Sequence, residues 1–176
     1  MSEKSLLAID TQIWIYYYDP NTPEYDAIHK WLEPVLHTED ILLSAIIPVE
    51  IAHNLFTLRN SGINLDADRI EELLIELLSM EKCHFIDIDQ DIVAYSIFLL
   101  KKLRNTGVGG RDAIIVASME RFGVNTIVTH DKNILALESY HRIDPVFDPP
   151  LELHVNDVFD SEDFKSKMND LINHGE

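Results

Sequence analysis

The sequence predicts an α/β domain built around a parallel β-sheet. Short apolar segments at residues 5–9, 41–43, 84–88 and 125–128 alternate with longer stretches of helical periodicity. Strands that alternate with helices in this way form parallel βαβ units. The chain has 176 residues, of which 46% are hydrophobic, with only 6 Gly and 7 Pro. It is therefore long enough to bury a core of its own, and its length suits one domain.

The amino-terminal half is predicted to hold two of these strands and three helices. The first strand stops abruptly at Asp10, and the turn residues 19–23 then precede a helical stretch to about Leu36. The second strand is followed by Ser44, a residue type that caps the amino ends of helices, so a helix is expected to begin there. Residues 66–80 repeat apolar side chains at helical spacing, which predicts the third helix.

The carboxyl-terminal half continues the alternation. Asp89 is placed to cap a helix that ends near Arg104. The expected buried face of this helix consists of Val93, Ile97, Leu100 and Leu103. After a glycine-rich break, another helix is predicted from Arg111 to Gly123, a residue suited to a left-handed carboxyl-terminal cap. A last amphipathic helix is predicted at 161–172.

Charge and composition exclude several classes of protein. The chain has 14 Lys and Arg against 31 Asp and Glu, so its formal net charge is −17. Such acidity works against tight attraction to nucleic acid, whose phosphates require Lys and Arg. No apolar run reaches the ~20 residues that a membrane helix needs. The single cysteine, Cys83, cannot form an internal disulfide. We therefore expect a cytoplasmic protein without a membrane anchor.

Acidic residues lie at positions where a charge is unusual. Asp10 and Asp131 follow buried strands, and ligands bind at the carboxyl ends of parallel strands. Glu50 lies within an apolar helix, and Asp112 opens another. If these four acids lie close together, their like charges repel unless protons or a divalent cation neutralise them. Mg²⁺ or Mn²⁺ is the cation best suited to such a set, because every ligand is oxygen. Taken singly, each acid has a simpler explanation as a turn cap, a helix-dipole partner or a solvent-facing residue.

Segments of the chain that contain these acids resemble the successive motifs of PIN domains. The segments are Leu7–Thr11, the helix at 44–55 around Glu50, Gly110–Ala117 and Ile127–Asp131. Their order and spacing match the family over about residues 5–147. The resemblance implies a three-layer α/β/α sandwich with a central parallel sheet. It also implies an endoribonuclease that uses Mg²⁺ or Mn²⁺ to hydrolyse single-stranded RNA, as in the VapC toxins of toxin–antitoxin pairs.

The resemblance further implies roles for particular side chains. The metal-binding and catalytic residues would be Asp10, Glu50, Asp112 and Asp131. Thr11 and Thr129 match hydroxyl positions that orient the metal ligands or a nearby water. Arg111 adjoins Asp112 and is the best placed basic residue near the acids. Asn133 stands where relatives often carry a further acid, which leaves one metal held firmly by protein.

The expected organisation is a PIN-like nuclease domain at 1–147 and a carboxyl-terminal extension at 148–176. The extension would pack on the same domain or on a partner. By resemblance, the expected partners are an RNA substrate, a small antitoxin protein and a second copy of the chain in a homodimer. The acidic surface suits a basic antitoxin that places an Arg or Lys in the acidic groove.

Other interpretations stay open at this point. One is a catalytically weak PIN-fold scaffold that binds a protein partner or RNA in RNA processing, and Asn133 and the charge of −17 favour it. Another is a salt-adapted nuclease whose acidity keeps it soluble. His130 and Lys132 would supply positive charge beside Asp131. The eight histidines show no spacing typical of zinc sites.

Overall fold

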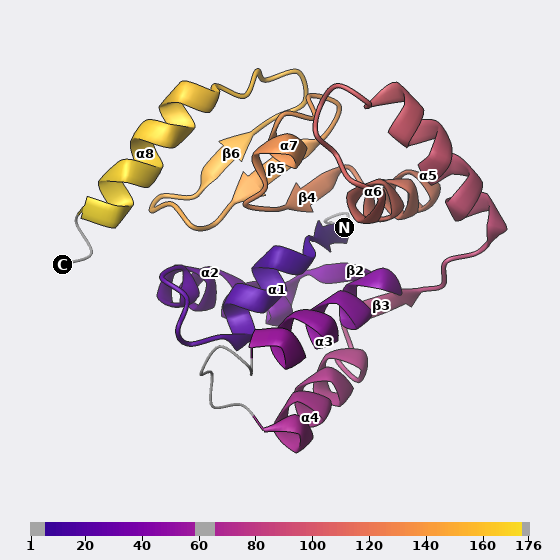
Figure 1. Cartoon of the computed structure of the whole chain (residues 1–176), viewed down its shortest axis with the longest axis vertical. Coiled ribbons are helices and arrows are strands. Elements are labelled where there is room, and N and C mark those ends of the chain that lie inside the picture. Colours follow the sequence, from indigo (N-terminus) through magenta and orange to yellow (C-terminus); the bar gives the residue numbers. More distant parts are fainter. Residues whose placement is uncertain (1–5, 59–65, 174–176) are drawn as a thin grey trace.

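A computed structural model describes residues 6–58 and 66–173 and contains a six-stranded sheet of order β3-β2-β1-β4-β5-β6 (Figure 1). The strands are β1 (Leu6–Ile9), β2 (Asp40–Ser44), β3 (Cys83–Ile86), β4 (Thr126–Val128), β5 (His141–Asp144) and β6 (Leu151–Leu153). All pairings are parallel except that of β6, which runs antiparallel to β5. Because β1 lies between β2 and β4, a residue that follows β1 lies between the residues that follow these two adjacent strands.

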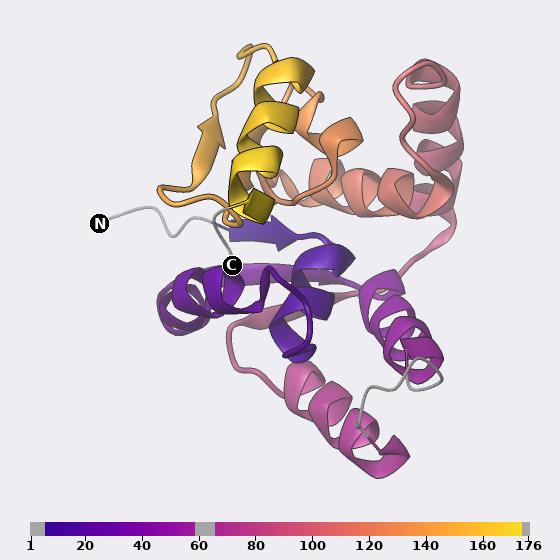
Figure 2. The ribbon, with the colours of Figure 1, turned by 60° about the vertical axis from the view of Figure 1, so that its left-hand side comes forward.

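Helices cover both faces of this sheet. They are α1 (Thr11–Tyr18), α2 (Tyr25–Thr38), α3 (Ile46–Leu58), α4 (Ala67–Leu78), α5 (Gln90–Lys102), α6 (Gly110–Phe122), α7 (Lys132–Leu135) and α8 (Ser161–Asn173). Helices α1 to α4 lie on one side of the sheet, and α5, α6 and α8 lie on the other (Figures 1 and 2). The predicted three-layer α/β/α sandwich with a largely parallel central sheet is confirmed.

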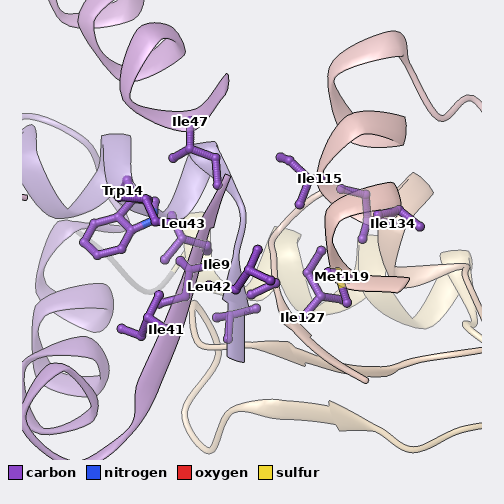
Figure 3. Packing of buried hydrophobic residues seen from close by; sticks show 14 of the residues in the cluster. Ile9, Trp14, Ile41, Leu42, Leu43, Ile47, Ile115, Met119, Ile127 and Ile134 are labelled. Carbon is purple, nitrogen blue, oxygen red and sulfur yellow. The ribbon is translucent and has the colours of Figure 1, made fainter. Parts of the chain in front are cut away.

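The core lies on both faces of the central strands. Both faces of β1 and β2 are covered, so Ala8, Ile9 and the residues 41–43 are all buried. Figure 3 shows Trp14 and Ile47 packed against one side of these strands, and side chains of α6 packed against the other. This packing holds the central strands rigidly, which fixes the positions of the residues that follow them.

The predicted strands are all present, with ends that differ by one or two residues. Ser5, with which the first predicted strand begins, lies outside the described residues. The short helices α1 and α7 and the strands β5 and β6 are additional elements that the sequence pattern does not predict. Strand β5 has the sequence His-Arg-Ile-Asp and β6 has three residues, so neither forms a recognisable apolar run.

Ser44 does not cap a helix, contrary to the prediction. It is the last residue of β2, and α3 begins two residues later at Ile46. Its buried hydroxyl accepts a hydrogen bond of 3.2 Å from the Ser118 hydroxyl on α6. The pair joins the sheet to the helix that covers it, and this satisfies a polar group that the core would otherwise leave unpaired.

The predicted buried face of α5 is wrong at Val93 and Ile97, whereas Leu100 and Leu103 are partly buried against the core. Val93 and Ile97 are 42% and 62% exposed, whereas Ile92, Ser96 and Leu99 are buried. Apolar residues surround most of this helix, so periodicity alone does not select the face that packs against α6. The buried Ser96 hydroxyl donates a hydrogen bond of 2.8 Å to the Val93 carbonyl of the same helix, so it is not left unpaired.

Two predicted helix ends are confirmed. The Asp89 carboxylate caps α5 by accepting a hydrogen bond of 3.0 Å from the Ile92 backbone N–H. Gly123 ends α6 in the left-handed conformation with a φ of 67°.

Among the helices of residues 6–58 and 66–173, none is long and apolar enough to cross a membrane.

Candidate active site

The predicted acids meet in a cleft at the carboxyl ends of the central strands. Asp10 follows β1 and Asp131 follows β4, and these two strands are neighbours in the sheet. Helices α3 and α6 bring Glu50 and Asp112 to the same cleft, which has a volume of about 440 Å³. The cleft is also lined by Thr11, Gln12, Tyr16 and Arg111.

Asp10 is buried and is held by a hydroxyl from the neighbouring strand. Thr129 Oγ1 donates a hydrogen bond of 2.8 Å to Asp10 Oδ2 and accepts one of 3.0 Å from the Asp131 backbone N–H. The pKa of Asp10 is raised from 3.8 to about 7: burial is the largest cause, the Thr129 hydrogen bond opposes it, and the charges of Asp112 and Asp131 add to it. The charged form of Asp10 is therefore disfavoured in this cleft.

Glu50 is also buried, but its carboxylate is paired within the protein. Thr11 Oγ1 donates a hydrogen bond of 2.7 Å to Glu50 Oε2, and Arg111 Nη1 lies 2.6 Å from Glu50 Oε1. The Arg111 side chain is 66% exposed, so this guanidinium reaches from the protein surface to a buried carboxylate. Arg111 thus offsets the charge of Glu50.

Asp112 and Asp131 cap helices and line the cleft at the same time. Asp112 Oδ2 accepts a hydrogen bond of 2.7 Å from the Gly109 backbone N–H at the start of α6. Asp131 Oδ1 accepts one of 2.7 Å from the Asn133 backbone N–H at the start of α7. Both acids therefore bond to the backbone at the start of a helix, and this is compatible with a role in the cleft, because each uses one carboxylate oxygen in these bonds.

Thr129 and Asn133 do not line the cleft. Thr129 contributes indirectly, because its hydroxyl forms hydrogen bonds with the Asp10 carboxylate and with the Asp131 backbone N–H. The Asn133 side chain packs against Gly107, where an added Cβ would come within 2.7 Å of Asn133 Oδ1 and where φ is 82°. Asn133 therefore fixes the glycine-rich segment before α6, the helix that carries Asp112.

The donor set of the cleft suits a hard divalent cation. Its acidic side chains offer only oxygen, and a cation would stabilise the charged form of Asp10, which burial and the nearby Asp112 and Asp131 disfavour. Within the described residues, the acids of the cleft form no set of three whose ligand atoms all lie within 4.8 Å of one another. Binding of an ion would have to draw these carboxylates together or place water between them, because like charges stay apart without a cation.

A buried histidine beside the cleft has a different role from the one predicted. His130 is directed at a carboxylate other than that of Asp131, because its Nδ1 lies 2.8 Å from Asp144 Oδ2 and both of these side chains are buried. Its ring packs edge-on to Tyr16 at 6.1 Å between centroids and lies 5.5 Å from Phe164 of α8. This cluster fixes the turn between β4 and Asp131. The sequence offers no signal for it, because the partners come from β5 and α8.

The model of the PIN domain family matches residues 7–140, which include every predicted acid of the cleft. No curated protein sequence is significantly similar to the chain. Solved structures share the fold at low sequence identity. Mycobacterium tuberculosis VapC20, a sarcin-ricin loop cleaving toxin, is 14% identical with a TM-score of 0.60 over 74% of this chain and 93% of that chain.

Two further solved structures give the same result. FitAcB from Neisseria gonorrhoeae is 17% identical with a TM-score of 0.56, covering 79% of this chain and 97% of that chain. VapBC2 from Rickettsia felis, bound to a DNA fragment from its promoter, is 19% identical with a TM-score of 0.56, covering 78% of this chain and 96% of that chain. These likenesses reproduce the α/β/α architecture described above. Since the family model spans most of the chain, from β1 to Tyr140, the protein belongs to the PIN domain family.

Proposed function

We propose that this protein is a metal-dependent endoribonuclease that hydrolyses phosphodiester bonds of single-stranded RNA, and that it acts as a VapC-type toxin in the cytoplasm. The observation that carries the proposal is the position of Asp10. It is buried at the carboxyl ends of β1 and β4, and the nearby charges of Asp112 and Asp131 oppose its ionisation. A divalent cation would offset this negative charge, and the same cation would bind the phosphate oxygens of RNA.

Asp10, Asp112 and Asp131 would hold Mg²⁺ or Mn²⁺, directly or through water, and Glu50 would complete the acidic set. A divalent ion in such a site supplies an activated water and stabilises the leaving oxygen. Thr129 holds the Asp10 carboxylate in one orientation, and Thr11 does the same for Glu50. No covalent enzyme intermediate is required.

Arg111 would meet the RNA backbone. Its exposed guanidinium reaches into an acidic cleft, and a phosphate would compete with Glu50 for it. The rest of the chain offers little attraction for RNA, since its net charge is −17. We therefore expect weak RNA affinity that depends steeply on salt.

A small basic antitoxin would cover the cleft. The neighbours FitAcB and VapBC2, and a toxin–antitoxin complex from Klebsiella pneumoniae, support a partner of this kind. An Arg or Lys of the antitoxin would take the position of the cation among the acids. The PIN-like nuclease domain would span 1–147, with 148–176 as an extension of the same domain, and we expect the active form to be a homodimer.

The alternative is a PIN-fold scaffold that binds a protein or RNA with little catalysis. The pairing of Glu50 favours it, because Arg111 and Thr11 already engage both oxygens of that carboxylate. Asn133, which packs on Gly107, adds no charge to the cleft.

Cleavage of a labelled single-stranded RNA separates the two proposals. Wild type, Asp10→Asn and the control Asp68→Asn, an exposed position on α4, are each assayed with Mn²⁺, Mg²⁺ or EDTA. The nuclease proposal expects cutting by wild type and Asp68→Asn in either metal, and none with EDTA or with Asp10→Asn. Equal inactivity of all three proteins across metals and salt concentrations would leave the scaffold as the function.

A further inference from the structure

A second group of metal-ligating side chains lies at the opposite edge of the sheet from the acids. His141 begins β5, while Glu152 and His154 lie within and just after β6. One ligand atom of each lies within 4.8 Å of the others. Because β5 is parallel to β4 and β1, its first residue is at the amino ends of the strands, whereas Asp10 and Asp131 follow carboxyl ends. The group is therefore separate from the cleft.

The register of the last two strands brings these residues together. Ile143 pairs with Glu152 across the antiparallel ladder. Continuing this register by two residues sets His141 opposite His154. Glu152 and His154 are two residues apart in an extended segment, so their side chains lie on the same face. The arrangement depends on the pairing of β5 with β6, two strands that the sequence pattern does not predict.

The histidines of the group are close together and incompletely paired. The rings of His141 and His154 are stacked, with centroids 4.9 Å apart and planes inclined by 15°. His141 Nε2 lies 3.9 Å from Glu152 Oε2, is buried and has no hydrogen-bond partner in the described chain. Burial lowers the pKa of His141 and the neighbouring His154 lowers it further, although Glu152 opposes them. This favours the neutral imidazole, the form that binds metals.

We propose that His141, Glu152 and His154 form a binding site for a transition-metal ion of the Zn²⁺ class. Two imidazole nitrogens and one carboxylate are ligands that such ions prefer, unlike the all-oxygen set of the cleft. Ligand atoms in a tetrahedral zinc site lie about 3.3 Å apart. Glu152 and His154 are exposed, so small side-chain movements would bring the atoms that now lie within 4.8 Å of one another to that spacing.

The ion would cross-link the start of β5 to the end of β6. Strand β6 is at the edge of the sheet and pairs only with β5 over three residues among those described. A metal bridge would therefore hold the edge strand and the extension that follows it, with water in the fourth coordination position. This inference does not depend on the proposed nuclease activity.

Zinc titration by calorimetry tests the site, with protein free of any affinity tag and with excess Mg²⁺ present to occupy the acidic cleft. The variants are His154→Ala and Glu152→Gln, and the control is His37→Ala, an exposed histidine on α2. Wild type and His37→Ala are expected to bind one Zn²⁺ with the same Kd. Both site variants should raise that Kd by more than about tenfold, the effect of losing even an outer partner of a metal site.

Imidazole nitrogen resonances locate the ion. The ¹⁵N signals of His141 and His154 are expected to shift on addition of Zn²⁺, while those of His37 and His84 stay in place. The proposal would be overturned by absence of Zn²⁺ binding to wild type, by an unchanged Kd in His154→Ala, or by shifts confined to other histidines. Loss of RNA cleavage would not affect any of these results, because none of them measures activity.

Discussion

Thr129 donates its hydroxyl proton to the buried carboxylate of Asp10 at 2.8 Å, which joins the carboxyl ends of the two central strands. The same oxygen accepts a hydrogen bond from the Asp131 backbone N–H. One threonine thus positions two of the proposed metal ligands. A valine at 129 would keep the shape of the side chain and remove both interactions.

Thr129→Val should reduce metal-dependent RNA cleavage by about 10- to 100-fold, as expected when an outer partner of a metal ligand is lost. It should also lower the free energy of unfolding by about 1–3 kcal/mol, because the Asp131 N–H loses its acceptor in a partly buried position. Cleavage rates over a range of Mn²⁺ concentrations and urea unfolding measure the two effects. The control is Thr57→Val, since that hydroxyl is exposed on α3. Wild-type metal dependence in Thr129→Val would show that Asp10 needs no such support.

The raised pKa of Asp10 predicts how the stability of the metal-free protein depends on pH. The pKa is about 7 in the folded chain against 3.8 ordinarily, so the folded state binds the proton more tightly. Stability due to this group is therefore fully present below about pH 4 and is lost as the pH rises through 7. Over this range the loss is a few kcal/mol, because each tenfold difference in proton affinity between the folded and unfolded chain corresponds to about 1.4 kcal/mol.

Urea unfolding in EDTA at pH 5 and pH 8 tests this sign. Asp10→Asn lacks the titrating group, so at pH 8 it should be more stable than wild type, and at pH 5 the difference should shrink. Titration of groups far from Asp10 is common to both proteins and cancels in the comparison, whereas Asp112 and Asp131 interact with the Asp10 charge and contribute to the difference. If the difference between the two proteins were the same at both pH values, the burial of a charged Asp10 would not be costly.

The positions of the strand-end acids follow from sequence because they depend on local pattern. A short apolar run that stops at a polar residue places Asp10 and Asp131 after parallel strands, and parallel strands align their carboxyl ends. The pairing of Glu50 with Arg111 does not follow from the sequence. It depends on the approach of α3 to α6, which is set by packing against the sheet.

Contacts made by β5 and β6 could not be predicted. The buried pair of His130 and Asp144 and the cluster around His141 depend on β5, which is mostly polar, and on β6, which has only three residues. Such strands form because the parallel sheet supplies a partner edge, not because their own residues favour extended structure. Tertiary context therefore determines these elements, whereas β1 and β4 are recognisable from their apolar residues.

The corrected face of α5 has a direct consequence for stability. Ile92 is buried and Ile97 is 62% exposed, although both are isoleucines on one helix. Ile92→Ala should lower the free energy of unfolding by about 2–4 kcal/mol, since it opens a cavity. Ile97→Ala should change it by less than about 0.5 kcal/mol, as is usual at the surface. Urea denaturation of the two variants measures both changes. If Ile97→Ala lost more stability than Ile92→Ala, Ile97 would lie on the buried face, as periodicity predicts.

The ring of Phe164 on α8 should couple the carboxyl-terminal extension to the cleft. It lies against His130 and Phe147 at 5.5 Å and 5.6 Å between centroids. Phe164→Ala should therefore lower the free energy of unfolding by about 2 kcal/mol, less than a fully buried phenylalanine because the ring is half-buried. It should also weaken Mn²⁺ binding through the turn that carries Asp131. Val158→Ala, at a side chain 74% exposed, is the control. Wild-type stability in Phe164→Ala would mean that the extension packs elsewhere.

Arg111 should affect metal and RNA in opposite directions. The guanidinium is the basic partner of Glu50, so Arg111→Ala leaves that carboxylate with only the Thr11 hydrogen bond among the contacts described above. Because an unpaired buried carboxylate gains more from a cation, the variant should bind Mn²⁺ more tightly than wild type.

The cleft of Arg111→Ala also loses its exposed positive charge, so KM for RNA should rise by about tenfold at low salt. The salt dependence of KM should become shallower, by the amount expected for about one phosphate contact. Mn²⁺ titration and KM measured over a range of salt concentrations separate the effects, with Arg69→Ala on α4 as the control. A lower Mn²⁺ affinity combined with an unchanged KM would assign Arg111 a purely structural role at the start of α6.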